Sequence, residues 1–238
     1  MRDALTTAYQ QELKRTRAAV SNAVKQHWLN LPEYRDAQVD PFLRRVTPLV
    51  HAGQRRAIAL TDAYLSHKLG TKPLGLDVDS LVGNVRNGVS SDVVYTRPFQ
   101  TVWSSVKAIG FAAALAKATS RLTSTVDMDL MMSQRDATRA YGQANDRIVA
   151  WQRVADPSCC DFCQTIDGAK CYSEDASPLH NNCGCTLEPI DSSSDSNSND
   201  FVSFTAGSVF GDVALREHGE MGLLITDKDY DFTGPEDF

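Results

Sequence analysis

The sequence predicts a mainly α-helical protein in which an N-terminal helical bundle precedes a small α+β module and an acidic, partly extended C-terminal tail. The chain has 238 residues, 42% hydrophobic but only 8% aromatic, so its core must depend on alanine, valine and leucine, which favours helices. Apolar residues recur at helical spacing through most of residues 1–155. All six cysteines lie between Cys159 and Cys185, and an acidic segment follows them.

The first two helices are predicted from stripes of apolar residues. In residues 1–28 the stripe consists of Leu13, Val20, Val24 and Trp28. Asp40 and Pro41 then form a typical N-cap and first-turn pair for a helix that continues to Gly70. Its stripe consists of Phe42, Val46, Leu49, Gly53, Ala57, Leu60 and Tyr64. Two arginine pairs three turns apart, Arg44–Arg45 and Arg55–Arg56, are expected on its exposed face.

A loop and two further helices are predicted before the cysteines. Residues 71–97 contain Pro73 and three glycines between short valine-containing runs, which predicts a loop with at most one small strand. Pro98 is expected to open the third helix, and the fourth is expected to end near Pro157. The stripe of the fourth helix consists of Leu130, Ala137, Tyr141, Ala144, Ile148 and Trp151. Four long helices of this kind predict a bundle.

Charge divides the chain into two parts. Residues 1–155 contain 21 Lys and Arg against 13 Asp and Glu, whereas residues 156–238 contain 3 against 17. The basic helical part suits nucleic-acid phosphates or an acidic partner, while DNA would repel the acidic part. The alternative is that both parts present ordinary solvated faces.

The sequence predicts neither a membrane span nor a secretory signal. Its longest uncharged apolar run, Ala108 to Ala116, has nine residues, about half of what a bilayer span needs. The first twenty residues contain six charged side chains and lack the apolar region of a signal peptide. We therefore expect the chain to be made in a cytoplasm, with its cysteines initially reduced.

The cysteine segment predicts a metal site. Cys160 and Cys163 form C-x2-C, and His180, Cys183 and Cys185 form H-x2-C-x-C seventeen positions later. Two short clusters at about this separation suit tetrahedral Zn²⁺, because each supplies ligands on a tight turn. The sequence therefore predicts a small Cys/His zinc-binding module at residues 156–190. A polar linker at 191–200 and the acidic tail at 201–238 follow it. Four protein ligands would leave no position for water, so the zinc would be structural.

Two questions about the cysteines stay open at this stage. Five candidate ligands exceed four coordination positions, so at least one is spare. Cys159 and Cys171 are the expected non-ligands, although a C-x3-C pair through Cys159 is an alternative. The cysteines could instead form disulfides, but the adjacency of Cys159 and Cys160 and a reducing compartment disfavour that.

The sequence gives no support for catalysis. It lacks the G-x-S-x-G, H-E-x-x-H, G-x-x-x-x-G-K-[ST] and G-x-G-x-x-G patterns. A nucleophile at Cys163 or Cys185, paired with His180, is conceivable, but these residues suit metal ligation better. We therefore predict that the protein is not an enzyme.

The order of these segments resembles one protein family. A helical region followed by WQRVADPSCCDFC at residues 151–163 and LHNNCGCTLEP at residues 179–189 is similar to the MuF-like head morphogenesis proteins. These are minor capsid proteins of tailed bacteriophages, and the similarity is greatest to those of phages that infect actinobacteria. YTRPF at residues 95–99, REHGEMGLLIT at 216–226 and DFTG at 231–234 resemble further segments of that family. Order and spacing together, rather than any single motif, make the resemblance specific.

This resemblance implies a structural component of the virion, made in the host cytoplasm and located at the portal vertex or the inner face of the head. The family pattern falls on Cys160, Cys163, His180, Cys183 and Cys185. The implied partners are the portal protein, the major capsid protein, or both, with packaged double-stranded DNA as a further contact of the basic helices. The rival functions are a zinc-stabilised nucleic-acid-binding protein and an enzyme that uses a cysteine or transfers ADP-ribose.

Overall fold

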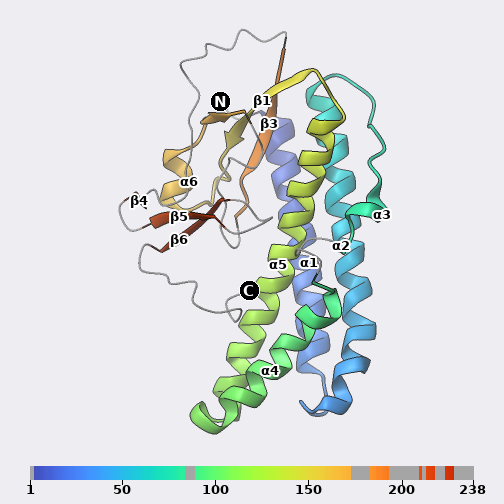
Figure 1. The fold of residues 1–238 in the computed structure, drawn as a ribbon, viewed down its shortest axis with the longest axis vertical. Helices are drawn as coiled ribbons and strands as arrows, with labels where there is room; N and C mark the ends of the chain where they lie inside the picture. Colours follow the sequence, from blue (N-terminus) through green and yellow to red (C-terminus); the bar gives the residue numbers. More distant parts are fainter. Residues whose placement is uncertain are drawn as a thin grey trace.

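Four long helices dominate the computed structural model and confirm the mainly α fold class (Figure 1). They are α1 (Ala4–Leu29), α2 (Val39–Lys68), α4 (Ser91–Ile109) and α5 (Phe111–Gln143). The short helical segments are η1 (Asp36–Gln38), α3 (Val78–Leu81) and α6 (Asp161–Thr165). The structure describes residues 3–83, 89–172 and 183–192, and the backbone of 209–210, 213–217 and 223–227. Within these residues, no helix has the length and apolarity that crossing a bilayer requires.

The first two helices form where the sequence predicts them, with one difference at a boundary. The side chain of Asp3 caps α1 by accepting a hydrogen bond from the Leu5 N–H. Helix α2 begins at Val39, so Asp40 lies in its first turn and is not the N-cap that the sequence predicted. The 3-10 turn η1 leads directly into α2, and Gln38 therefore occupies the cap position. The helix ends just before Gly70, whose φ of +64° is the left-handed conformation that glycine tolerates.

Helix α4 begins well before Pro98, so the prediction that this proline opens the helix is wrong. The hydroxyl of Ser90 caps α4 by accepting a hydrogen bond from the Val93 N–H at 3.4 Å. Pro98 lies inside the helix and is buried there. The small strand allowed for in residues 71–97 is absent from the part of that loop that the structure describes, where residues 78–81 form α3 instead.

The remaining helical prediction is wrong at its C-terminal end. Gly110, with φ +80°, separates α4 from α5, and α5 then runs without interruption to Gln143. Residues 148–154, predicted to be helical, form strand β1 (Ile148–Val154). Isoleucine, valine and tryptophan favour strands when a partner strand is present, and here that partner lies beyond the cysteines.

Strand β1 is the centre of a three-stranded antiparallel sheet with the order β2-β1-β3. Strand β2 (Lys170–Cys171) and strand β3 (Thr186–Asp191) flank it, and Trp151 lies opposite both Cys171 and Pro189. In the C-terminal part, β4 (Val209–Phe210), β5 (Val213–Glu217) and β6 (Leu223–Asp227) form a second antiparallel sheet. These strands agree with the partly extended C-terminal tail that the sequence predicts. Residues 193–200 of the predicted linker lie outside the described residues.

Two clusters of buried side chains form the core. One surrounds Trp28 at the end of the bundle where α4 packs against α5. The other joins the bundle to the first sheet through residues such as Tyr9, Tyr64, Tyr141 and Trp151. A Cβ at Gly142 would lie 2.9 Å from the Trp151 ring, so glycine allows the sheet to approach α5 this closely.

Replacing Trp28 with alanine should lower the free energy of unfolding by about 3–5 kcal/mol, because a large buried side chain is lost and a cavity remains. Trp28 is fully buried, stacks edge-on against Phe42 and Phe99, and donates to the Thr119 hydroxyl at 3.0 Å. Trp103→Ala is the matched control, because Trp103 is 38% exposed, and it should cost much less. Urea denaturation of both variants measures the difference, and equal losses would contradict this account of the core.

Candidate metal centre

Three cysteine sulfurs converge beside the first sheet. Cys163 is the third residue of α6, whereas Cys183 and Cys185 lie just before β3. The three sulfur atoms all lie within 4.8 Å of one another. In a tetrahedral site with Zn–S distances of about 2.3 Å, two sulfurs are about 3.8 Å apart, so this spacing needs only a small contraction. The three cysteines (hereafter the sulfur cluster) could therefore hold a metal ion.

The other predicted site residues have different positions. Cys160 is the N-cap residue of α6, is exposed and does not belong to the sulfur cluster. His180 lies outside the described residues. Cys159 is half-buried and, like Cys160, does not belong to the sulfur cluster. Cys171 is buried in the core cluster that contains Trp151. All six cysteines lie in the described part of the chain, and the structure pairs none of them in a disulfide.

A buried arginine lies against the sulfur cluster. Nη2 of Arg153, on β1, is 3.2 Å from the sulfur of Cys163 and 3.7 Å from that of Cys183. Only 4% of Arg153 is exposed. The backbone N–H of Asp156 donates to the third sulfur, that of Cys185, at 3.4 Å. Each sulfur of the cluster therefore has a hydrogen-bond donor, which is the environment that stabilises thiolates.

The charges of this site fit a bound divalent cation. Hydrogen bonds with Cys183 and Cys185, together with burial, raise the pKa of the Cys163 thiol far above its usual value, so the metal-free thiol is protonated. Burial lowers the pKa of Arg153, but the thiolate forms of the sulfur cluster outweigh this and raise it above its usual value. A divalent ion with three thiolates has a net charge of −1. The guanidinium of Arg153 would neutralise that charge inside the protein.

The local backbone explains how two cysteines reach the cluster from one short segment. The Asp156 carboxylate accepts a hydrogen bond from the Ser158 N–H at 2.8 Å and fixes the turn after β1. A Cβ on Gly184 would lie 2.9 Å from Cγ of Asp156, so only glycine permits this approach. Gly184 therefore lets the C-x-C segment pack directly on that turn.

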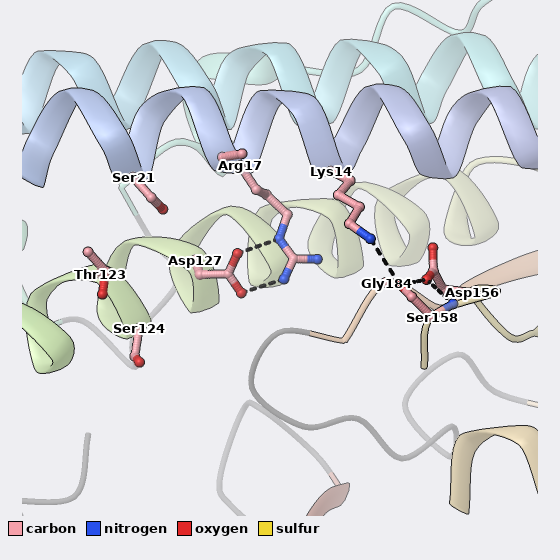
Figure 2. A pocket seen from close by; sticks show the side chains of 10 residues that line it. Lys14, Arg17, Ser21, Thr123, Ser124, Asp127, Asp156, Ser158 and Gly184 are labelled. Carbon is pink, nitrogen blue, oxygen red and sulfur yellow. Dashed lines mark hydrogen bonds and ion pairs between the residues drawn. The ribbon is translucent and has the colours of Figure 1, made fainter. Parts of the chain in front are cut away.

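Helix α1 attaches this segment to the bundle (Figure 2). The guanidinium of Arg17 makes two hydrogen bonds to the Asp127 carboxylate on α5 and donates to the carbonyl oxygen of Cys183 at 2.5 Å. Nζ of Lys14 donates to the Ser158 hydroxyl at 2.9 Å. These contacts border a polar pocket of about 360 Å³, which lies between α1, α5, the turn after β1 and Gly184. The segment that bears Cys183 is therefore held against the bundle by the buried and half-buried contacts of Arg17, and the turn after β1 by the exposed contact of Lys14.

Sequence analysis missed Arg153, Arg17 and Asp127. Arg153 interrupts an apolar run, and that is a signal only once residues 148–154 are recognised as a strand that passes beside the cysteines. Arg17 and Asp127 are far apart in the sequence, and nothing in either segment indicates that they form an ion pair.

Comparisons with known proteins do not assign this chain to a family. No protein-family model, no curated protein and no solved structure matched it. The functional conclusion therefore depends on the chemistry of the site and on the residues that resemble the phage family.

If the sulfur cluster holds a metal ion, replacing Arg153 with methionine should weaken the binding of that ion by about 10- to 100-fold, the usual cost of losing a partner of a metal ligand. The reason is that the negative charge of a metal–thiolate centre would be left buried without its counter-charge. Arg153→Lys, which keeps the charge, should retain more affinity than Arg153→Met. Competition with a chromophoric chelator measures both affinities. Unchanged affinity in the methionine variant, with the fold intact, would contradict the role assigned to this arginine.

Proposed function

We propose that this chain is a structural minor capsid protein of the MuF-like head morphogenesis type, with a zinc-stabilised module packed on a helical bundle. The observation that supports the proposal most directly is the sulfur cluster beside Arg153. It lies in the two segments whose residues resemble that family, and its three cysteines belong to the family pattern. We propose that the protein acts by binding and that its cysteines serve as structural metal ligands.

Zinc is the metal we propose for this site. Soft thiolate ligands select zinc, copper(I) or iron–sulfur clusters, and the small separation of the three sulfurs suits a single tetrahedral ion. A structural zinc would join α6, the loop before β3 and, through Arg153, strand β1. This ion would stabilise a module that has a small apolar core of its own.

Cys163→Ser should abolish zinc binding and unfold the segment around the sulfur cluster while leaving the long helices folded. Structural zinc contributes about 10–16 kcal/mol of apparent binding free energy in small zinc modules, more than this short segment can replace. Elemental analysis of protein purified without chelator should show about one zinc ion in the wild type, and circular dichroism should show retained helicity in the variant.

The matched control is Cys171→Ala, because Cys171 is equally buried but packs in the apolar core. That variant should keep its zinc. A wild-type chain without zinc, or a Cys163→Ser variant that keeps it, would refute the proposed metal site.

The partner surface that we propose is the end of the bundle where α4 meets α5, away from the first sheet (Figure 1). Large apolar side chains are exposed there on α4 and at the start of α5, among them Trp103, Val106, Ile109 and Phe111. Phe111 packs against Tyr34, and Trp103 donates to the Tyr34 carbonyl at 2.7 Å, so these rings are held in place. Preorganised aromatic side chains dominate the binding energy of many protein interfaces, and the portal or the major capsid protein would cover these.

Combining Trp103→Ala with Phe111→Ser in the full chain should reduce its incorporation into heads by about tenfold or more, because interface aromatic residues commonly contribute at least 1–2 kcal/mol each. The test expresses the chain with portal and major capsid proteins and measures its amount in purified procapsids. Val149→Ser, an exposed apolar position on β1, is the control and should be incorporated normally. Normal incorporation of the double variant would show that the partner surface lies elsewhere on the protein.

A nucleic-acid-binding function is the second candidate, and the exposure of Arg44, Arg45, Arg55 and Arg56 on α2 favours it. Arg55 and Arg56 form surface ion pairs with Asp79 and Glu12, which leaves part of this basic face already neutralised. If DNA binds here, its affinity should fall steeply with salt, and replacing Arg44 and Arg45 with glutamine should reduce that salt dependence. Fluorescence anisotropy with a DNA duplex at several salt concentrations measures both effects.

A further inference from the structure

A groove lies on the surface of the bundle between α1 and α2, which run side by side (Figure 1). It has a volume of about 640 Å³. A Cβ on Gly53 would lie only 2.7 Å from Cγ2 of Val20, so glycine allows the two helices to approach this closely beneath the groove. The walls are apolar and mostly small: Ala19, Val20 and Ala23 from α1, and Leu49, Ala52 and Gly53 from α2.

This α1–α2 groove is separate from the metal centre and from the partner surface proposed above. Lys14 and Arg17, which attach the cysteine segment to α1, lie on the other side of that helix from Ala19. The aromatic side chains where α4 meets α5 do not line the groove. Ala19 and Ala52, one on each wall, are exposed to solvent.

Both ends of the groove are basic. At one end Arg15 and Arg56 share a single carboxylate partner, Glu12, and their side chains remain 72% and 60% exposed. At the other end Arg45 lies one turn before Leu49 on the same face of α2. Arg45 is exposed and, among the residues that the structure describes, forms no ion pair. Arg45 and Arg56 are three turns, or about 16 Å, apart, so each end has one positive charge that is not neutralised.

The shape and charge of the groove favour an acidic helix as its occupant. Both walls are helices, whose backbone groups are already hydrogen-bonded, so an extended segment would find no strand to pair with, whereas a helix satisfies its own backbone. The alanine and leucine side chains between the basic ends offer no donors to the phosphates of a nucleic acid. A second copy of this chain would place arginines against arginines, which is unfavourable.

We propose that the α1–α2 groove binds an acidic amphipathic helix of a partner protein, with apolar side chains between the alanine walls and a carboxylate at each basic end. The face that α2 presents consists of Arg45, Leu49, Ala52 and Arg56. The matching face of the partner has an acid, two apolar residues and a second acid at the same spacing. This spacing is the same in both directions along a helix, so it suits either orientation of the partner. The contact goes beyond the proposed function and depends on neither the metal nor the capsid proteins.

The experiment uses the full chain and a fluorescent helical peptide of about fourteen residues with this spacing. The peptide has two glutamates eleven positions apart, with leucines at the fourth and seventh positions after the first. A hydrocarbon link on its other face keeps it helical and removes the cost of ordering it. Fluorescence anisotropy at low salt measures the Kd, which should be in the micromolar range.

Two variants fill the groove from opposite walls. Ala52→Phe should weaken binding of the peptide by about tenfold or more, because the added ring occupies the space of its leucines. Ala19→Phe repeats the test from α1, so the result does not depend on the folding of one variant. Ala116→Phe, at an exposed position of α5, is the matched control and should bind normally. Circular dichroism checks that each variant keeps its helices.

A double-mutant cycle tests the charges. Arg45→Gln combined with Arg56→Gln should weaken binding by about three- to tenfold, because two exposed ion pairs are lost. A peptide with glutamines in place of both glutamates should bind the wild-type chain as weakly and should lose nothing further with the arginine variant.

Absence of peptide binding to the wild-type chain, or binding that both phenylalanine variants leave unchanged, would overturn the proposal. Equal losses of the two peptides with the arginine variant would refute the requirement for acids. A DNA duplex measured in parallel separates the remaining possibility. If it binds, and only the arginine variant weakens it while the peptide does not bind, this face is a nucleic-acid surface and the proposal is wrong.

Discussion

The buried guanidinium of Arg153 imposes the constraint on which the cysteine module depends. A buried cation needs an anionic partner, because its lost hydration is not otherwise compensated. Arg153 lies against the sulfurs of Cys163 and Cys183, which are neutral when protonated and negative when they bind a metal. A bound ion that keeps these thiols ionised would therefore place negative charge directly beside the Arg153 guanidinium. The attraction between this guanidinium and ionised sulfurs favours a fold in which β1, α6 and the segment before β3 meet at the sulfur cluster.

The fold brings the basic and acidic parts of the chain into contact through ion pairs. Cations from the basic part pair with acidic residues that follow the cysteines: Lys68 with Glu188, and Arg147 with Asp191. Within the bundle, Arg17 pairs with Asp127 and also binds the backbone of Cys183. The exposed members of such pairs contribute little stability, at most about 1 kcal/mol each. Their effect is to orient the acidic module on the basic bundle, and part of the asymmetry seen in the sequence is therefore satisfied inside the chain.

Sequence patterns predicted the candidate site only in part. Cysteine spacing identified the segment, because ligands on tight turns need short separations, and Cys163, Cys183 and Cys185 do converge. Spacing alone does not show that Cys160 lies outside the sulfur cluster, because its exposed position at the N-cap of α6 depends on where that helix begins. Arg153 was not predictable either, because its role follows from a strand that the helical periodicity of Ile148 and Trp151 concealed.

The sequence by itself determined the mainly helical class, the positions of α1 and α2, and the cysteine segment, because these depend on local periodicity and spacing. Helix α4 was harder to place, because a proline that fits an N-terminal turn lies instead within a helix capped at Ser90. Only the tertiary structure decided that residues 148–154 form a strand, since their pairing partner Thr186–Asp191 lies more than thirty residues further along the chain. It also decided which charges are buried. Long-range pairing and burial are properties of the assembled fold, and a local pattern contains no information about the partner.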